Sequence, residues 1–209
     1  MQINKRDLIK LFRRDISEHL VHLTRKNYDL SAKKVLLKIM YNGKLIGGNG
    51  FIKSKDRCIC FSEAPITEIA MLLKANEATF DSNSRPRYEP YGVVVPKEWF
   101  YQKGGRPVIY QSGSDYHYLS REIRYRHVRF ELNNDIDFTW EREWRLNADE
   151  LILDPKQVTF IVNKSEDIHD LQYGHFSNMK YAVAVLGDDA HQYIEQFPWK
   201  IISLDILQN

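Results

Sequence analysis

Helical periodicity dominates the first part of the chain. Apolar residues recur at helical spacing between charges over residues 4–20, which predicts an amphipathic opening helix. The next predicted helix has Ser31 as its N-cap and stops at Gly43. Two further helices are expected to begin at Pro65 and at Pro96, because proline suits the first turn of a helix.

Strand-like runs dominate the rest of the chain. Runs rich in β-branched and aromatic residues predict strands at 58–61, 93–95, 108–110, 128–132, 138–146, 158–162, 181–186 and 201–206. A last helix is expected at 188–196, and the polar stretch 76–90 is expected to be a long loop bordering a site. Helices that precede strands in this way favour an α+β fold over a regular βαβ winding, and we expect residues 1–209 to form a single domain.

Composition narrows the class of protein. A chain of 209 residues that is 43% apolar can bury a sizeable core without disulfides or a structural metal. No run approaches the ~20 apolar residues of a membrane span, and the N-terminus does not resemble a signal peptide, so we expect a cytoplasmic protein with no membrane partner. Cys58 and Cys60 would face the same side of one strand, which favours reduced, packed thiols. The histidines are scattered, so no metal site is expected.

The charge distribution is more informative than the formal net charge of +2. Four arginines lie around Tyr125 and His127, a density that can neutralise phosphates and stack on bases; they are Arg121, Arg124, Arg126 and Arg129. This cluster predicts a nucleic-acid-binding surface. An exposed basic edge without a ligand explains it equally well.

Two segments carry polar groups that packing alone would not require. In an alternating segment after the first helix, His22 and Thr24 face the same way. In a late predicted strand, Glu141, Glu143 and Arg145 share one face. Like charges on one pleated face repel, so the two glutamates indicate a ligand or a neutralising arginine. A solvated edge ribbon with cross-strand ion pairs is the alternative.

The order of short motifs along the chain adds to these residues. After the early histidine and threonine come CFSEAP at 60–65, YGVVVPKEW at 91–99, KGGRPVIY at 103–110 and EREWR at 141–145. In this order the motifs resemble the bacterial abortive-infection proteins of the AbiGi type, a family that is similar in turn to the DarT-like DNA ADP-ribosyltransferases. The resemblance covers roughly residues 20–165.

The resemblance implies an ADP-ribosyltransferase-like fold with N-terminal helices and a split, mixed β core, which binds NAD⁺ as co-substrate without a metal. His22 would bond the adenosine-side ribose with Thr24 in support, and Glu143 would grip the 2′-hydroxyl of the nicotinamide ribose. A carboxylate there stabilises the positive charge that develops on the sugar as nicotinamide departs. Glu141 would orient or deprotonate the acceptor.

Other side chains are candidates for the cofactor site. The resemblance places Phe61 and Ser62 around nicotinamide, although Phe61 also fits a core position. Tyr91, beside the predicted loop, would stack on nicotinamide or on an acceptor base, with packing as the alternative. A fixed guanidinium suits the pyrophosphate better than an ammonium does. The candidates for that contact are Arg25, Arg57 and Arg145.

These expectations lead to an NAD⁺-dependent ADP-ribosyltransferase that modifies DNA or RNA in a toxin or phage-defence role, with a cognate antitoxin as a further partner. An NAD⁺ glycohydrolase, in which water replaces the acceptor, is a neighbouring alternative. A non-catalytic antitoxin-like or nucleic-acid-binding module is an alternative from another class. A metal-dependent nuclease ranks below these, because no third ligand lies at a readable spacing from Glu141 and Glu143.

Overall fold

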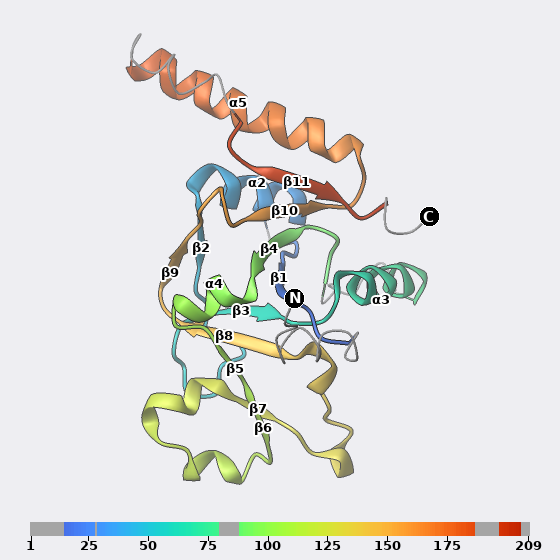
Figure 1. The fold of residues 1–209 in the computed structure, drawn as a ribbon, viewed down its shortest axis with the longest axis vertical. Helices are drawn as coiled ribbons and strands as arrows, with labels where there is room; N and C mark the ends of the chain where they lie inside the picture. Colours follow the sequence, from blue (N-terminus) through green and yellow to red (C-terminus); the bar gives the residue numbers. More distant parts are fainter. Residues whose placement is uncertain (1–14, 28, 80–87, 187–196, 206–209) are drawn as a thin grey trace, which may run out of the picture. The chain divides into compact units, whose positions relative to one another are not determined.

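The computed structural model describes residues 15–27, 29–79, 88–186 and 197–205 (Figure 1). Its strands are β1 (His19–Leu23), β2 (Lys44–Ile46), β3 (Cys58–Ser62), β4 (Gly92–Pro96), β5 (Arg106–Pro107), β6 (Ile109–Gln111), β7 (His127–Arg129), β8 (Glu143–Asn147), β9 (Glu150–Ile152), β10 (Thr159–Val162) and β11 (Lys200–Ser203). Its α-helices are α2 (Ala32–Asn42), α3 (Ile66–Thr79), α4 (Lys97–Gln102) and α5 (Glu166–Leu186). Short 3₁₀ helices cover Asp115–Tyr118, Arg121–Arg126, Leu132–Asn134 and Thr139–Glu141.

The largest sheet has the strand order β11-β10-β4-β1-β3-β8-β5, with parallel and antiparallel neighbours. This mixed sheet confirms the predicted α+β class. Within the described ranges, no helix combines the length and the apolar character needed to cross a membrane.

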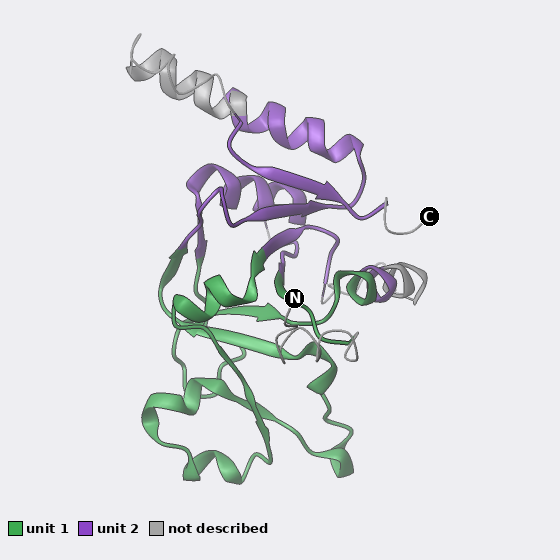
Figure 2. Ribbon diagram, viewed as in Figure 1, with its two compact units in different colours: residues 1–21, 46–69, 95–151 green, residues 22–45, 70–94, 152–209 purple. Residues whose placement is uncertain are grey.

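The chain divides into two compact units, each assembled from several segments (Figure 2). Unit 1 comprises residues 1–21, 46–69 and 95–151, and unit 2 comprises residues 22–45, 70–94 and 152–209.

Unit 1 is organised around the antiparallel pair β3 and β8. Short strand β5 pairs with the other edge of β8, and β1 pairs with β3. One face of β3 packs inward: Ile59 and Phe61 are buried, and the Phe61 ring lies 4.6 Å from that of the buried Phe100 in α4. Strands β6 and β7 form a separate parallel pair in this unit.

Unit 2 contains the parallel pair β10 and β11, with β4 antiparallel to β10. Val93 and Phe160 are completely buried in these strands, as the continuous apolar runs predict. Helix α2 packs against α5, and α5 also contacts β11 (Figure 1). The unit therefore covers its strands with its own helices.

Capping residues explain why α2 lies where the sequence predicts it. The Ser31 hydroxyl accepts a hydrogen bond from Lys34 N, which satisfies a free N–H of the first turn. Gly43 ends the helix with a φ of 60°, a left-handed conformation that glycine adopts without strain. The helices predicted after Pro65 and Pro96 are confirmed as α3 and α4.

Several predicted elements are wrong at their ends or in kind. Strand β1 begins at His19, so the last residues of the predicted helix 4–20 are not helical, and residues 4–14 lie outside the described part. Residues 181–186 end the 21-residue helix α5 and do not form a strand, because continuation of an established helix overrides local strand propensity. The predicted helix 188–196 lies outside the described residues.

Two loop and strand boundaries also differ. Residues 76–79 of the predicted loop are the last turn of α3, and 80–87 are not described. The predicted strand 128–132 shortens to β7, which starts at His127, and Leu132 begins a 3₁₀ turn.

The predicted strand 138–146 is the most consequential correction. Strand β8 begins only at Glu143, and the preceding Arg142 adopts a left-handed φ of 45°. The cause is local: the Asp137 carboxylate accepts from both the N–H and the hydroxyl of Thr139, which starts a helical turn through Glu141. Glu141 therefore does not share a strand face with Glu143.

Candidate active site

Strands β3 and β8 place a row of polar side chains on one face of unit 1. Ser62 lies directly opposite Glu143, and Cys60 lies opposite Arg145. Directly paired residues of antiparallel strands point to the same face. The row does not extend into β1 at this level, because the residue opposite Ser62 is the buried, apolar Val21. Ser62 and Glu143, which are both predicted site residues, are therefore cross-strand neighbours.

Glu143 is held by a two-pronged ion pair with Arg145. Arg145 Nε donates to Glu143 Oε1 at 2.8 Å and Nη2 donates to Oε2 at 2.9 Å, while the two side chains are only 6% and 14% exposed. Burial alone lowers the pKa of Arg145, but the hydrogen bonds and negative charge of Glu143 raise it above its ordinary value. The carboxylate therefore has a fixed rotation and a permanent counter-charge.

The remaining donors of Arg145 are also used within unit 1. Nη1 donates to Tyr125 O at 2.7 Å and to His127 O at 3.1 Å. With the two bonds to Glu143, four of the five guanidinium N–H groups have protein partners. The prediction that Arg145 pairs with the pyrophosphate is therefore not supported by its geometry.

Two neutral groups flank the Glu143 carboxylate and backbone. The Tyr110 hydroxyl accepts from Glu143 N at 3.0 Å. Burial raises the pKa of Tyr110 to about 12, with the charge of Glu143 adding to it. Burial and then the same charge raise the pKa of the Cys60 thiol well above its ordinary range. Both groups stay protonated at neutral pH, so neither acts as a base there: Tyr110 accepts the N–H of Glu143, and the Cys60 thiol is bonded to the Glu143 carboxylate.

Ser62 and Phe61 are adjacent in β3 but have different surroundings. The Ser62 hydroxyl donates to Glu141 O at 2.5 Å and accepts from Ala64 N at 3.2 Å. Its proton is used to hold the turn before Glu143. Phe61 is 2% exposed and packs on Phe100, so the core alternative applies and its predicted contact with nicotinamide is not supported.

A second network, which the sequence analysis missed, lies around Glu63. Lys97 Nζ binds Glu63 Oε1 at 2.7 Å, and Trp144 Nε1 donates to Glu63 Oε2 at 2.8 Å. The available signal was an acidic residue directly after a buried strand and two residues before Pro65. Its partners are distant in sequence, so the signal did not identify them.

In unit 2 the predicted residues gather where β1 ends beside β4. Thr24 N donates to Tyr91 O at 2.7 Å, and the Thr24 hydroxyl donates to Tyr91 O at 2.9 Å and to Ala32 O at 3.3 Å. Gly92 approaches the strand so closely that a Cβ there would lie 2.5 Å from His22 O. His22 is half-buried and Thr24 is buried, so the backbone that carries His22 is held firmly.

The Tyr91 hydroxyl is bound to the start of α5. It donates to Asp167 Oδ2 at 3.1 Å, and Lys33 Nζ binds Asp167 Oδ1 at 2.7 Å. Burial raises the pKa of Tyr91 to about 12, with the charge of Asp167 adding to it. Tyr91 thus packs within unit 2 and links β4 to α5, which favours the packing alternative.

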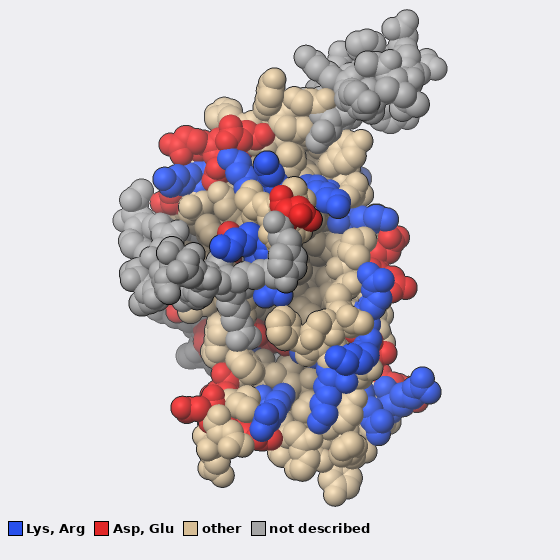
Figure 3. All heavy atoms as spheres, turned by 180° about the vertical axis from the view of Figure 1, so that it is seen from behind, with Lys and Arg blue, Asp and Glu red and all other residues tan. Residues whose placement is uncertain are grey.

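Most arginines of the predicted nucleic-acid surface bind the protein itself. Arg124 Nε donates to Leu119 O at 3.0 Å, Arg126 Nε donates to Pro107 O at 2.8 Å, and Arg129 pairs with Glu131 at 2.5 Å. Arg121 is exposed at the start of its 3₁₀ helix. Tyr125 and His127 are buried, so stacking of bases on these two rings is not supported by the structure. Figure 3 shows acidic side chains among the basic ones on the face drawn.

The other arginines predicted for the pyrophosphate differ in their contacts. Arg57 donates to Gly47 O at 3.1 and 2.9 Å and pairs with Asp149 at 3.2 Å, so it stabilises a turn of unit 1. Arg25 is half-buried just beyond the end of β1 in unit 2, and its role stays a prediction.

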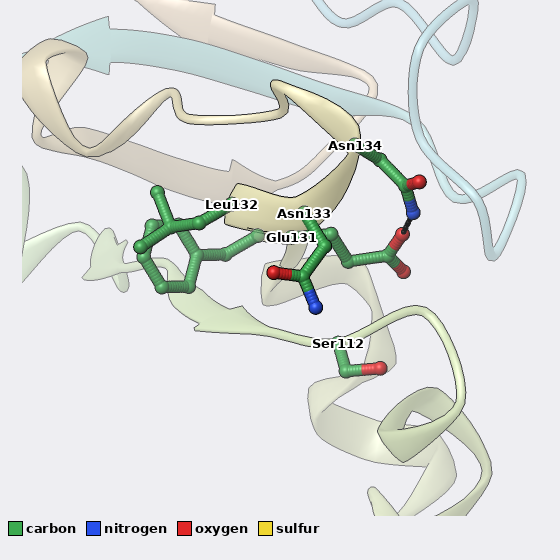
Figure 4. A pocket seen from close by; sticks show the side chains of 6 residues that line it. Ser112, Glu131, Leu132, Asn133 and Asn134 are labelled. Atoms are coloured by element: carbon green, nitrogen blue, oxygen red, sulfur yellow. Dashed lines mark hydrogen bonds between the residues drawn. The ribbon is translucent and has the colours of Figure 1, made fainter.

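A hollow of about 450 Å³ lies elsewhere in unit 1 (Figure 4). Its lining contains none of the predicted site residues; it comprises Ser112, Phe130, Glu131, Leu132, Asn133 and Asn134. Glu131 accepts from Gly113 N at 2.9 Å and from Asn134 Nδ2 at 2.7 Å. These donors and, foremost, Arg129 lower its pKa to about 2. The carboxylate is thus satisfied internally, and we assign the hollow no role.

Comparison with known proteins gives one structural likeness. No family model matches the chain, and neither does any curated protein. The chain is similar to a solved structure described as "Thermus sp. 2.9 DarT in complex with NAD+", with 10% identity and a TM-score of 0.41, covering 91% of this chain and 96% of that one. At this level of likeness, function has to be argued from the chain's own residues.

Proposed function

We propose that the protein is an NAD⁺-dependent ADP-ribosyltransferase in which Glu143 is the catalytic carboxylate. One observation carries the proposal: two hydrogen bonds from Arg145 fix the Glu143 carboxylate on a strand face that also holds the neutral Cys60 thiol. This arrangement supports the chemistry that the motif order implies. A transferase of this kind needs a permanently ionised, preorganised carboxylate more than it needs a proton acceptor.

The chemistry follows from the sugar. Cleavage of the bond between nicotinamide and ribose leaves an oxocarbenium-like carbon, and a carboxylate bonded to the neighbouring 2′-hydroxyl stabilises that charge as it forms. The acceptor then bonds to the same carbon, and its proton passes to a base. Glu141 was predicted to be that base. It lies in a 3₁₀ turn and not in β8, so strand geometry does not place its side chain on the same face as Glu143.

The residues that bind the rest of NAD⁺ and the acceptor of the ADP-ribose are part of the same proposal. His22 and Thr24 are proposed to serve the adenosine side of NAD⁺, as the motif order implies. DNA or RNA is the proposed acceptor, with Arg121 as its exposed basic contact. A toxin or phage-defence role, a cognate antitoxin and a cytoplasmic location complete the proposal.

The test is transfer of label from NAD⁺. The purified protein is incubated with ³²P-NAD⁺ and DNA, RNA or cell lysate, and incorporation and NAD⁺ loss are measured. Glu143→Gln should lower kcat by about 10²–10³-fold, because the charge on the sugar is then unopposed. Glu98→Gln, an exposed change in the same unit, is the matched control and should keep its activity. If the wild type neither incorporates label nor consumes NAD⁺, the proposal is rejected.

An NAD⁺ glycohydrolase is the second candidate function. It is favoured by the ion pair of Arg129 with Glu131 and by the bonds of Arg124 and Arg126 to backbone carbonyls, which leave fewer free guanidinium donors for a nucleic acid. Free ADP-ribose as the sole product, with every nucleic acid and lysate fraction unlabelled, would establish it.

A further inference from the structure

Glu63 is bonded to the residues on both sides of Glu143. Its backbone N–H donates to Arg142 O at 3.2 Å, and its carboxylate accepts from Trp144 Nε1 at 2.8 Å. Glu143 itself is the residue between these two contacts. The predicted catalytic side chain is therefore bracketed by one acidic residue of another segment.

The chain changes conformation directly before Glu143, the first residue of β8. Arg142 has a φ of 45°, a region that L-residues rarely adopt, and it separates a 3₁₀ turn from the first residue of β8. The Ser62 hydroxyl holds the preceding carbonyl, Glu141 O, at 2.5 Å. The consecutive residues Ser62 and Glu63 thus fix the segment at 141, 142 and 144.

The carboxylate of Glu63 is itself immobilised. Lys97 Nζ binds its other oxygen at 2.7 Å, and both side chains are only 15% exposed. Lys97 is the first residue of α4, and its N–H donates to Glu18 O at 2.8 Å. A half-buried carboxylate with two fixed partners has little freedom to change rotamer. Glu63 therefore links the first residue of α4 to Trp144.

We infer that Glu63 is a positioning residue for Glu143, acting through the Arg142 carbonyl and the Trp144 indole. Glu63 sets the direction in which the chain leaves the left-handed turn, while Arg145 sets the rotation of the carboxylate. The consequence for catalysis rests on the proposed function. The placement of Glu143 can be measured without it.

The experiment uses four variants of the full chain: Glu63→Leu, Glu63→Gln, Trp144→Phe and the double variant Glu63→Leu with Trp144→Phe. Hydrogen exchange of the amides of 142–146 is compared with that of 159–162 in unit 2, and kcat and KM for NAD⁺ are measured. Glu63→Leu should speed exchange at 142–146 by about tenfold and leave 159–162 unchanged. It should lower kcat by about tenfold with KM within twofold.

The other variants separate positioning from general destabilisation. Glu63→Gln keeps an acceptor for the Trp144 indole, so exchange should stay within about threefold of the wild type. Exchange at 142–146 in the double variant should be no faster than in Glu63→Leu, because both changes remove the same hydrogen bond. Should Glu63→Leu not fold, Trp144→Phe gives the same readout, because it removes the indole N–H and keeps an aromatic ring at this position.

Unchanged exchange at 142–146 in Glu63→Leu would overturn the inference. Two other results would also overturn it. One is a rate increase in the double variant equal to the sum of the increases in the two single variants, and the other is exchange in Glu63→Gln as fast as in Glu63→Leu. If the wild type does not consume NAD⁺, the proposed function fails, and the exchange data still decide the positioning role.

Discussion

In unit 1 the predicted catalytic side chain is held by a charged partner, whereas in unit 2 the predicted ribose-binding histidine lies on a strand held by backbone contacts. Glu143 depends on two short bonds from the buried Arg145. The strand at His22 depends on the close approach of Gly92 and on the hydrogen bonds of Thr24 to Tyr91 O. The first arrangement depends on charge and the second on shape.

The ion pair of unit 2 shows why this difference matters. Lys33 is 28% exposed where it binds Asp167, whereas Arg145 is 6% exposed where it binds Glu143. Water screens the first pair, and an ammonium has no fixed plane to match a carboxylate. Unit 2 therefore relies on that pair much less than unit 1 relies on its arginine.

Loss of Arg145 is expected to have the largest effect on stability, because it tests whether charge holds Glu143 in unit 1. Arg145→Met should lower the free energy of unfolding by about 3–5 kcal/mol, because Glu143 is left buried without its counter-charge. Urea unfolding measures the change, and Arg121→Met, at an exposed position, should cost less than about 0.5 kcal/mol. A cost below about 1 kcal/mol for Arg145→Met would mean that charge does not hold Glu143.

The shape dependence of unit 2 is tested by adding one methyl group. Gly92→Ala would place a Cβ 2.5 Å from His22 O, and we expect a loss of about 1–3 kcal/mol in the free energy of unfolding. Gly50→Ala is the control, because nothing lies within 4 Å of its Cβ position. Equal stability of the two variants would show that β1 tolerates displacement at His22.

A smaller effect is expected from Asp167, whose contribution to the free energy of unfolding should depend on pH. Burial alone raises the pKa of its carboxyl, but Lys33, Lys164 N and the Tyr91 hydroxyl lower it below its ordinary value. A carboxyl with a depressed folded pKa stabilises the fold above its unfolded pKa of about 4 and loses that contribution as the pH falls through the folded value. Asp167→Asn should therefore cost about 1 kcal/mol at pH 7. Urea unfolding should show this difference shrinking below pH ~4, and a constant difference would contradict the assignment.

Thiol reactivity gives the smallest signal and reports on the polar face of unit 1. Burial raises the pKa of Cys58 to about 11 and that of Cys60 well above its ordinary value, so little thiolate exists at pH 8. Ellman's reagent should react slowly with the folded protein and release two equivalents after unfolding. Fast release of one equivalent from the folded chain would show that this face opens to solvent.

Elements with local signals were predictable from the sequence. Ser31 and Gly43 bounded α2, and the run of three valines marked β4. The strand pairing that brings Ser62 opposite Glu143 was not predictable, because register depends on the whole sheet. The roles assigned to Glu143 and His22 came from motif order and remain predictions.

The incorrect parts have identifiable physical causes. The strand expected through Glu141 failed because the bonds of Asp137 to Thr139 compete with strand formation. Glu63 was missed because its partner Lys97 lies 34 residues away, so no local pattern connects them. The sequence left two roles for Arg145, as counter-charge of the glutamates or as partner of the pyrophosphate. Its bonds to Glu143 favour the first role, which pattern alone could not decide because it does not report burial.

The register of β3 has a consequence for how this protein tolerates change. Phe61 lies opposite Trp144 and Ser62 lies opposite Glu143. Alternate side chains of β3 therefore point to opposite faces of the sheet, one packed with apolar groups and the other carrying the polar row. Loss of a single residue from this strand would exchange the two sets, sending an aromatic ring toward the carboxylate and a hydroxyl into the apolar layer. Among descendants of this chain, the length of the segment between Arg57 and Pro65 should thus vary less than the identity of its apolar residues.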